Sequence, residues 1–87
     1  MAELQERRKR ALYRASHRGT KEMDWLLGRF AQAEVAAMEP AELDAFEALL
    51  ALPDPQLESW IVRGVSTADN GVTALIERLR GFHGLSG

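Results

Sequence analysis

The stretch Arg18-Gly19-Thr20-Lys21-Glu22 decides the fold of this chain, because it holds a helix stop and a helix start within five residues. Gly19 stands where a helix commonly ends, since glycine adopts a left-handed backbone there at little cost. Thr20 follows as an N-cap whose hydroxyl satisfies a free amide of the next helix. Glu22 lies in the first turn of that helix, where the macrodipole favours a carboxylate. The stretch therefore predicts a tight corner between two helices, although so short a pattern alone favours a plain capped turn.

The sequence on both sides of this corner has helical periodicity. Residues 3–17 contain no Gly or Pro and predict one amphipathic helix, and a second is expected over 21–37 with an apolar face for the core. Trp25 projects almost opposite the centre of that face. It is either an exposed interface anchor or a residue of a helix buried on two sides, and its size favours burial. Gly28 in the helix interior indicates close packing of another helix or a partner.

Prolines divide the middle of the chain into two further helices. Pro40 opens the first of these helices, which ends before Pro53. Asp54 as the N-cap and Pro55 as the first helical residue start the next one. Gly64 ends that helix.

A polar link at 66–70 leads to a fifth helix, whose apolar residues recur at helical spacing over 72–79. No segment shows sustained alternation of apolar and polar residues, so a sheet is not expected. The sequence predicts an all-α fold, a compact five-helix bundle, formed by one domain over 1–87. Residues at about 1–6 and 81–87 are expected to be flexible.

Composition excludes several classes of protein. The 87 residues include no cysteine, so a disulfide scaffold, thiolate catalysis and cysteine-ligated metal are excluded. The longest apolar run, 48–52, is far shorter than the ~20 residues that span a bilayer. The first residues also lack the pattern of a secretory signal. We expect a cytoplasmic protein without membrane insertion, although a processed organellar protein presents the same kind of N-terminus.

Charge is distributed unevenly, although the net charge is only −2. Eight of the eleven Lys and Arg residues lie within the first 29 positions, whereas residues 30–62 carry seven acidic side chains and no basic ones. This division can orient a partner of complementary charge, and it can also reflect an internal arrangement in which the basic first helix packs beside acidic helices. The basic helix keeps two alternatives open, a small helical adaptor and a nucleic-acid-binding module. The isoelectric point of about 5.6 argues against nucleic acid, which is not an expected partner.

Residues that would support catalysis are missing from the sequence. His17 and His83 are the only histidines, and neither belongs to a metal-ligand motif. His83 lies in a Gly-rich tail and is expected to be solvated. No nucleophile elbow, dinucleotide fingerprint or P-loop occurs. We therefore expect a protein that is not an enzyme, with no metal site and no permanently bound cofactor.

Several motifs in fixed order resemble those of one known family. Residues 18–24 (RGTKEMD) fit an R-G-x-x-E-x-D signature, and Phe30 follows at the next helical position. The segments 46–50 (FEALL) and 52–60 (LPDPQLESW) fit a pattern of leucines, D-P-x-L and a tryptophan. The chain thereby resembles the SdhE family, also called succinate dehydrogenase assembly factor 2, over residues 9–79. It departs from many members in having His17 where they carry Arg.

The resemblance implies an assembly chaperone that promotes covalent attachment of FAD to the flavoprotein subunit of succinate dehydrogenase or of a related fumarate reductase. Attachment would be largely intrinsic to the flavoprotein, which a monomeric helper holds in a reactive arrangement. Arg18 and Glu22 would supply charge-assisted hydrogen bonds to this partner, and Gly19 would permit close approach. Asp54, Pro55 and Trp60 would be structural, as helix cap, first helical residue and core residue respectively. The residues implied to bind the partner are His17, Arg18, Gly19, Lys21, Glu22 and Asp24.

Overall fold

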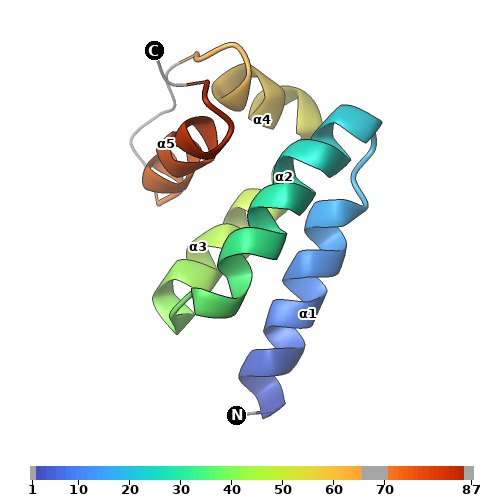
Figure 1. The fold of residues 1–87 in the computed structure, drawn as a ribbon, viewed down its shortest axis with the longest axis vertical. Coiled ribbons are helices and arrows are strands. Elements are labelled where there is room, and N and C mark those ends of the chain that lie inside the picture. The colour runs from blue at the N-terminus through green and yellow to red at the C-terminus, as the bar shows by residue number, and fades with distance from the viewer. Residues whose placement is uncertain (1, 66–70, 86–87) are drawn as a thin grey trace.

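Five α-helices follow one another in the computed structural model, which describes residues 2–65 and 71–85 (Figure 1). No strand occurs in these two ranges, and the predicted all-α five-helix bundle is confirmed. The predicted link at 66–70 lies outside them. The predicted flexible ends include residues 2–6 and 81–82, which are helical here. The helices are α1 (Ala2–Ser16), α2 (Lys21–Glu34), α3 (Pro40–Leu50), α4 (Asp54–Ile61) and α5 (Thr73–Phe82), with one 3₁₀ turn, η1 (Val35–Ala37), after α2.

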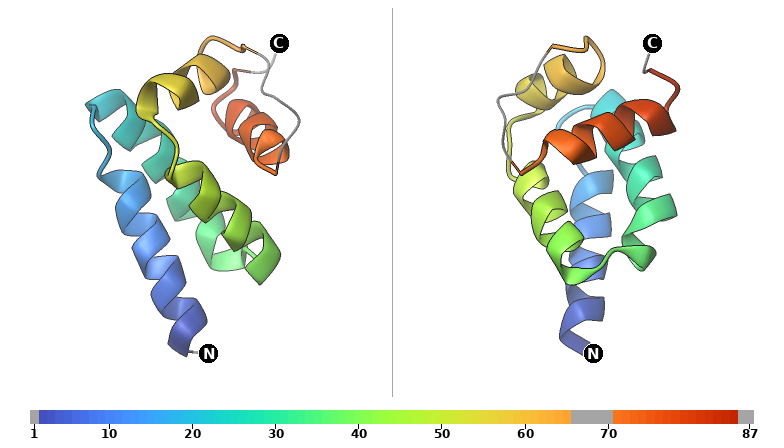
Figure 2. Two further views of the ribbon diagram at one scale, coloured as in Figure 1. Left: turned by 180° about the vertical axis from the view of Figure 1, so that it is seen from behind. Right: turned by 90° about the vertical axis from the view of Figure 1, so that its left-hand side faces the viewer.

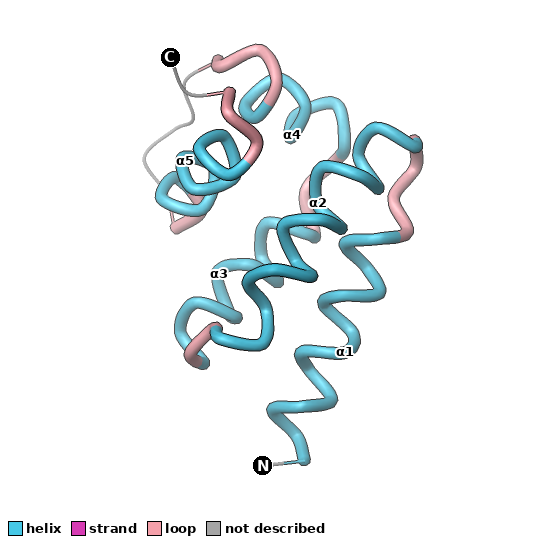
Figure 3. Tube along the Cα trace, viewed as in Figure 1, coloured by secondary structure: helices cyan, strands magenta, loops and turns pink. Residues whose placement is uncertain are grey.

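The first three helices run up, down and up, so that α1 lies antiparallel beside α2 and also contacts α3 (Figures 1 and 2). At one end of this three-helix unit, α5 packs against both α4 and α2. Short loops join α1 to α2 and α3 to α4 (Figure 3). The α1–α2 corner therefore lies at the same end of the molecule as the start of α4.

Local capping explains where these helices begin and end. The Thr20 hydroxyl accepts a hydrogen bond from the Met23 amide at 3.2 Å, which confirms Thr20 as the N-cap of α2. A capping box between Glu39 and Glu42 opens α3. Past the end of α4, Gly64 adopts a left-handed backbone with φ of 70°, as a helix-terminating glycine does.

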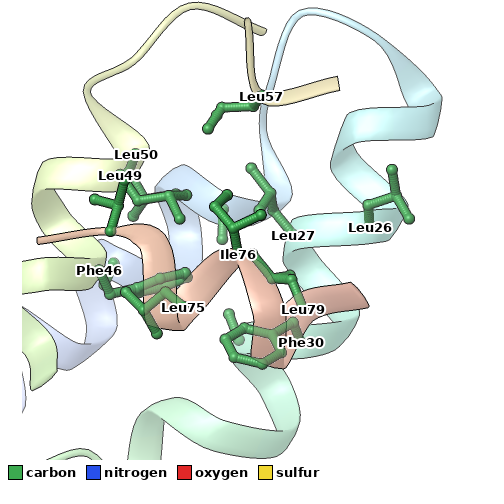
Figure 4. Packing of buried hydrophobic residues seen from close by; sticks show 14 of the residues in the cluster. Leu26, Leu27, Phe30, Phe46, Leu49, Leu50, Leu57, Leu75, Ile76 and Leu79 are labelled. Carbon is green, nitrogen blue, oxygen red and sulfur yellow. The ribbon is translucent and has the colours of Figure 1, made fainter. Parts of the chain in front are cut away.

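The core consists of apolar side chains from every helix. Side chains of α2, α3, α4 and α5 point toward one another, and the Phe30 and Phe46 rings lie 5.9 Å apart (Figure 4). Trp60 is only 8% exposed, which confirms it as a core residue. No polar or charged residue of the described ranges is fully buried.

Gly28 packs against the end of α1, where an added Cβ would lie 3.0 Å from Ser16 Oγ, so the predicted close approach of another helix is confirmed.

Part of the uneven charge is neutralised inside the molecule. Arg7 of α1 forms ion pairs with Asp44 and Glu47 of α3, the second at 2.8 Å. Hydrogen bonding to Arg7 lowers the pKa of Glu47, and the same contacts raise the pKa of Arg7. The expectation that the basic helix packs beside an acidic helix is therefore confirmed for α1 and α3. No helix within the described residues is both long and apolar enough to cross a membrane.

Candidate functional site

Arg18, in the α1–α2 corner, turns its side chain toward the α3–α4 link. Its Nε donates to Asp54 Oδ1 at 2.9 Å, while its two terminal nitrogens donate to the carbonyls of Leu50 at 2.7 Å and Leu52 at 2.9 Å. The Arg18 side chain is only 11% exposed, and that of Asp54 is 19% exposed. The guanidinium of Arg18 thus fastens the corner to a segment more than thirty residues away.

Gly19 is held by the same carboxylate. Its amide donates to Asp54 Oδ2 at 2.9 Å, and a Cβ at this position would lie 3.1 Å from that oxygen. Two predictions are wrong here. Gly19 lacks the left-handed backbone, since positive φ in the described residues occurs only at Gly64 and Gly84. Asp54 is the first residue of α4, and the N-cap is Pro53. The Asp54 carboxylate accepts hydrogen bonds from Arg18 and Gly19 and does not cap the helix.

Asp24 stabilises the corner from the first turn of α2. Its carboxylate accepts a hydrogen bond from the backbone amide of Arg18, one turn before α2 begins. The Asp24 side chain is half-buried, and it also lies in the first turn of α2, where the helix dipole favours a negative charge. The backbone that carries Arg18 and Gly19 is therefore fixed at both ends by carboxylates.

Glu22 is exposed on the outer side of this corner, next to exposed Lys21. The pKa of Glu22 is raised chiefly by a hydrogen bond with the carboxyl group of Glu58, and further by burial and by repulsion from that group. Two carboxyl groups from α2 and α4 thus lie side by side. In the ionised state they repel each other, and a donor from a partner would relieve that repulsion.

His17 forms the outer edge of the corner. Its ring stacks on that of Tyr13 with centroids 3.9 Å apart, and its Nδ1–H donates to the Tyr13 carbonyl at 2.8 Å. Both residues are exposed. The stacking fixes the orientation of the His17 ring on the last turn of α1.

The structure brings all six predicted partner-binding residues to one end of the α1–α2 pair, and it adds two residues from α4. Asp54 had been assigned a capping role, and Glu58 had no assigned role. Both lie in the 52–60 segment, whose D-P-x-L pattern alone predicts only a helix start. No signal in the sequence shows that this segment folds back onto the corner.

A shallow groove of about 340 Å³ continues from the corner along α2. Trp25 on this groove is 53% exposed, so the predicted burial of Trp25 is wrong. The helices that pack on α2 cover its opposite face, and Trp25 gains only partial cover from His83, whose ring centroid lies 4.8 Å away. His83 itself is half-buried and its Nε2–H donates to the Leu26 carbonyl at 2.7 Å, which corrects its predicted solvation. The groove is lined by Ser16, Lys21, Asp24, Trp25, Gly28, Arg29 and Gln32.

Comparison with known proteins identifies relatives over nearly the whole chain. The chain is 37% identical to the FAD assembly factor SdhE of Acetobacter pasteurianus, over 87% of this chain and 70% of that protein. It is 30% identical to the mitochondrial succinate dehydrogenase assembly factor 2 of Dictyostelium discoideum, over 88% of this chain and 55% of that protein. A third relative, the FAD assembly factor SdhE of Haemophilus ducreyi, is 32% identical over 72% of this chain and 77% of its own length.

No solved structure matches the chain significantly. The family model Sdh5, described as the flavinator of succinate dehydrogenase, matches residues 9–83, which contain the corner, the groove and the D-P-x-L segment. This chain therefore belongs to the Sdh5 family of succinate dehydrogenase flavinators.

Proposed function

We propose that this chain promotes covalent attachment of FAD to the flavoprotein subunit of succinate dehydrogenase, by binding that subunit through the α1–α2 corner. Membership of the flavinator family supports the attachment role. The observation that carries the choice of surface is the exposed Glu22 carboxyl group, held beside Glu58 with a raised pKa. An unfavourable pair of this kind, on a rigid and well-capped turn, is typical of a binding residue retained for function at a cost in stability.

The corner residues divide into two roles in this proposal. Arg18 and Asp24 are positioning residues, because their side chains already bond within the protein. Glu22, Lys21 and the backbone at Gly19 form the contact surface, because they are exposed. A hydrogen-bond donor on the flavoprotein would bind Glu22 more strongly than water does, since a charge-assisted bond also relieves the repulsion from the neighbouring carboxyl group.

The proposed mechanism is a population shift of the flavoprotein. A helper changes a conformational equilibrium only through its different affinity for the two conformations. A preference of about 2.7 kcal/mol would enrich the reactive conformation roughly a hundredfold. In this proposal the flavoprotein performs the chemistry, so the chain needs no catalytic residue and holds no FAD of its own. A fumarate reductase flavoprotein would be served by the same surface.

Two alternative functions receive less support. Arg7 is paired with acidic residues of α3, and Arg8 donates to the Met38 carbonyl at 2.8 Å. These contacts engage two of the basic side chains that a nucleic-acid-binding first helix would need for phosphates. A general helical adaptor would bind another protein without changing its flavin content. The attachment assay below separates that adaptor from a flavinator.

The test is to incubate the apo-flavoprotein with FAD, with and without this chain, and to measure flavin fluorescence of the flavoprotein after denaturing electrophoresis. The wild-type chain should accelerate attachment. Glu22→Ala and Gly19→Arg should abolish the acceleration, and Glu77→Ala, which removes an exposed carboxylate from α5, should retain it. The proposed site is wrong if the Glu22 and Gly19 variants are folded by circular dichroism and stimulate as well as wild type does.

A further inference from the structure

Three side chains of α2 form a stripe that the corner does not use. Lys21, Trp25 and Arg29 follow at intervals of four residues, so they lie on one side of the helix, and all three line the groove. An aromatic residue flanked by two cations is the composition typical of binding hot spots, which are enriched in Trp and Arg. We call these three residues the α2 stripe.

Trp25 is exposed and yet held in place. On one side it packs against the ring of His83, which is bonded to the Leu26 carbonyl of α2. The His83 ring in turn meets Phe82 edge-to-face at 4.9 Å, and Phe82 meets the core residue Phe30 at 5.6 Å. A chain of ring contacts thus connects Trp25 to the core. An indole that is already ordered loses little conformational entropy when a partner covers it.

The groove beside Trp25 depends on Gly28. Because Gly28 has no side chain, the last turn of α1 approaches α2 closely at Ser16. The groove lies between Trp25 and the end of α1, and Gln32 lines it as well. It is open to solvent, and its volume of about 340 Å³ has room for a side chain or a short extended segment.

The α2 stripe carries two cations without a carboxylate partner in the part of the chain that the structure describes. In the ranges 2–65 and 71–85, neither Lys21 nor Arg29 forms an ion pair with a carboxylate. Arg7 and Arg78, by contrast, are each paired with two acidic residues. The one carboxylate in the groove, that of Asp24, is hydrogen-bonded to the Arg18 amide.

We propose that the α2 stripe is a second part of the flavoprotein-binding surface, and that it takes an acidic segment of the flavoprotein with an apolar side chain seated against Trp25. This inference rests on the function proposed above. Charge complementarity selects an acidic partner segment. The stripe is continuous with the corner through Lys21, next to Glu22. A contact limited to the corner would also be far smaller than the ~800 Å² per partner of a typical specific interface.

Single-stranded nucleic acid is the other class of ligand that binds to an aromatic residue between two cations. A phosphate backbone needs an extended row of cations, and the isoelectric point of about 5.6 lies well below the basic value typical of nucleic-acid-binding domains. Two cations are enough to pair with the few carboxylates of a short acidic segment. The acidic protein segment is therefore favoured. Binding to nucleic acid becomes one outcome of the test.

The affinity test measures binding of the apo-flavoprotein subunit to the full chain at several salt concentrations. Trp25→Ala and Arg29→Glu should each raise Kd at least tenfold at low salt, and Arg29→Glu should weaken the salt dependence. Arg63→Glu is the matched control, because Arg63 is also exposed, follows α4 and changes the net charge equally. It should change Kd less than threefold. Circular dichroism confirms that each variant is folded.

The second test places a probe on the indole itself. Labelling with 5-fluorotryptophan gives one ¹⁹F resonance from Trp25 and one from buried Trp60, assigned with Trp60→Phe. Addition of the flavoprotein should shift or broaden the Trp25 resonance more than that of Trp60, and Glu22→Ala should abolish the change.

Three results would overturn the inference. If Glu22→Ala weakens binding but Trp25→Ala and Arg29→Glu do not, the α2 stripe is not in the interface, while the proposed function stands. If the wild-type chain does not bind the flavoprotein at all, the proposed function fails together with the stripe. If a fluorescent oligo-dT binds more tightly than the flavoprotein, and Trp25→Ala removes that binding, the stripe is a nucleic-acid site.

Discussion

The Arg18 guanidinium lies 2.8 Å from the Asp54 carboxylate, which also accepts a hydrogen bond from the Gly19 amide. The first residue of α4 therefore stabilises the corner between α1 and α2. The Asp54 carboxylate thus connects the start of α4 to the corner through an ion pair with Arg18 and a hydrogen bond from the Gly19 backbone. The geometry of the corner depends on α4 as much as on its own sequence.

Asp54→Ala should destabilise the protein by about 3 kcal/mol, because it leaves a largely buried guanidinium without its counter-charge. Urea unfolding followed by circular dichroism measures the change. Arg18→Lys should destabilise the protein less, by about 1–2 kcal/mol. The lysine ammonium keeps the positive charge but lacks the planar guanidinium that donates to three acceptors at once. The control is Lys9→Ala, whose exposed pair with Glu6 at 3.9 Å should contribute less than about 1 kcal/mol. Equal losses for Asp54→Ala and Lys9→Ala would contradict the structure.

Glu22→Gln should stabilise the isolated protein at pH 7 while it slows FAD attachment at least about tenfold, through loss of a charge-assisted bond. The raised pKa means that the folded state binds a proton more tightly than the unfolded state does. The wild type therefore loses stability as pH rises from the ordinary pKa, 4.5, through the raised value. The variant lacks this loss, so the urea midpoints should differ at pH 7 and converge below pH ~4.

Glu58→Gln is the matched control for that prediction. It removes the same repulsion but leaves the Glu22 carboxylate in place. It should therefore raise the urea midpoint at pH 7 without slowing attachment. If both variants slow attachment equally, the carboxyl pair acts as one unit and Glu22 is not the specific contact.

Two helix glycines should respond in opposite ways to substitution. Gly28→Val should destabilise by about 1–3 kcal/mol, because even its Cβ would lie 3.0 Å from Ser16 Oγ. Gly81→Ala in α5 should stabilise by about 0.5–1 kcal/mol, because its Cβ meets nothing within 4 Å and alanine favours the helix. Thermal or urea unfolding distinguishes the two signs. A stabilising Gly28→Val would show that α1 and α2 do not cross closely there.

Acid should weaken the contact between α1 and α3. Arg7 lowers the pKa of Glu47, so this pair contributes stability above the ordinary carboxyl pKa, and that contribution is lost as pH falls through the lowered value. Glu47→Gln should reduce the urea midpoint at pH 7, and the difference from wild type should vanish near pH 2. The control is Glu77→Gln, which changes an exposed side chain of α5 and should leave the urea midpoint at pH 7 unchanged.

Local chemistry in the sequence predicted the helices and most of their ends. The Thr20 cap, the Pro40 helix start and the left-handed Gly64 each depend on atoms within a few residues along the chain. The periodic apolar residues likewise predicted the core, including Trp60, because a helix of any orientation must bury its apolar face. The motifs of the corner and of the D-P-x-L segment also indicated the family.

Only the tertiary structure decided what the polar and aromatic residues of the site contact. Arg18 meets Asp54 across 36 positions, and His83 meets the Leu26 carbonyl across 57. Trp25 is exposed because none of the described helices covers its side of α2, and the ring of His83, just after α5, gives it only partial cover. Helix periodicity states which residues share a face, but the packing of other helices determines which faces are covered. The sequence by itself therefore determined the helices and the family, and the packing of α4 and α5 onto the α1–α2 pair determined the surface that a partner meets.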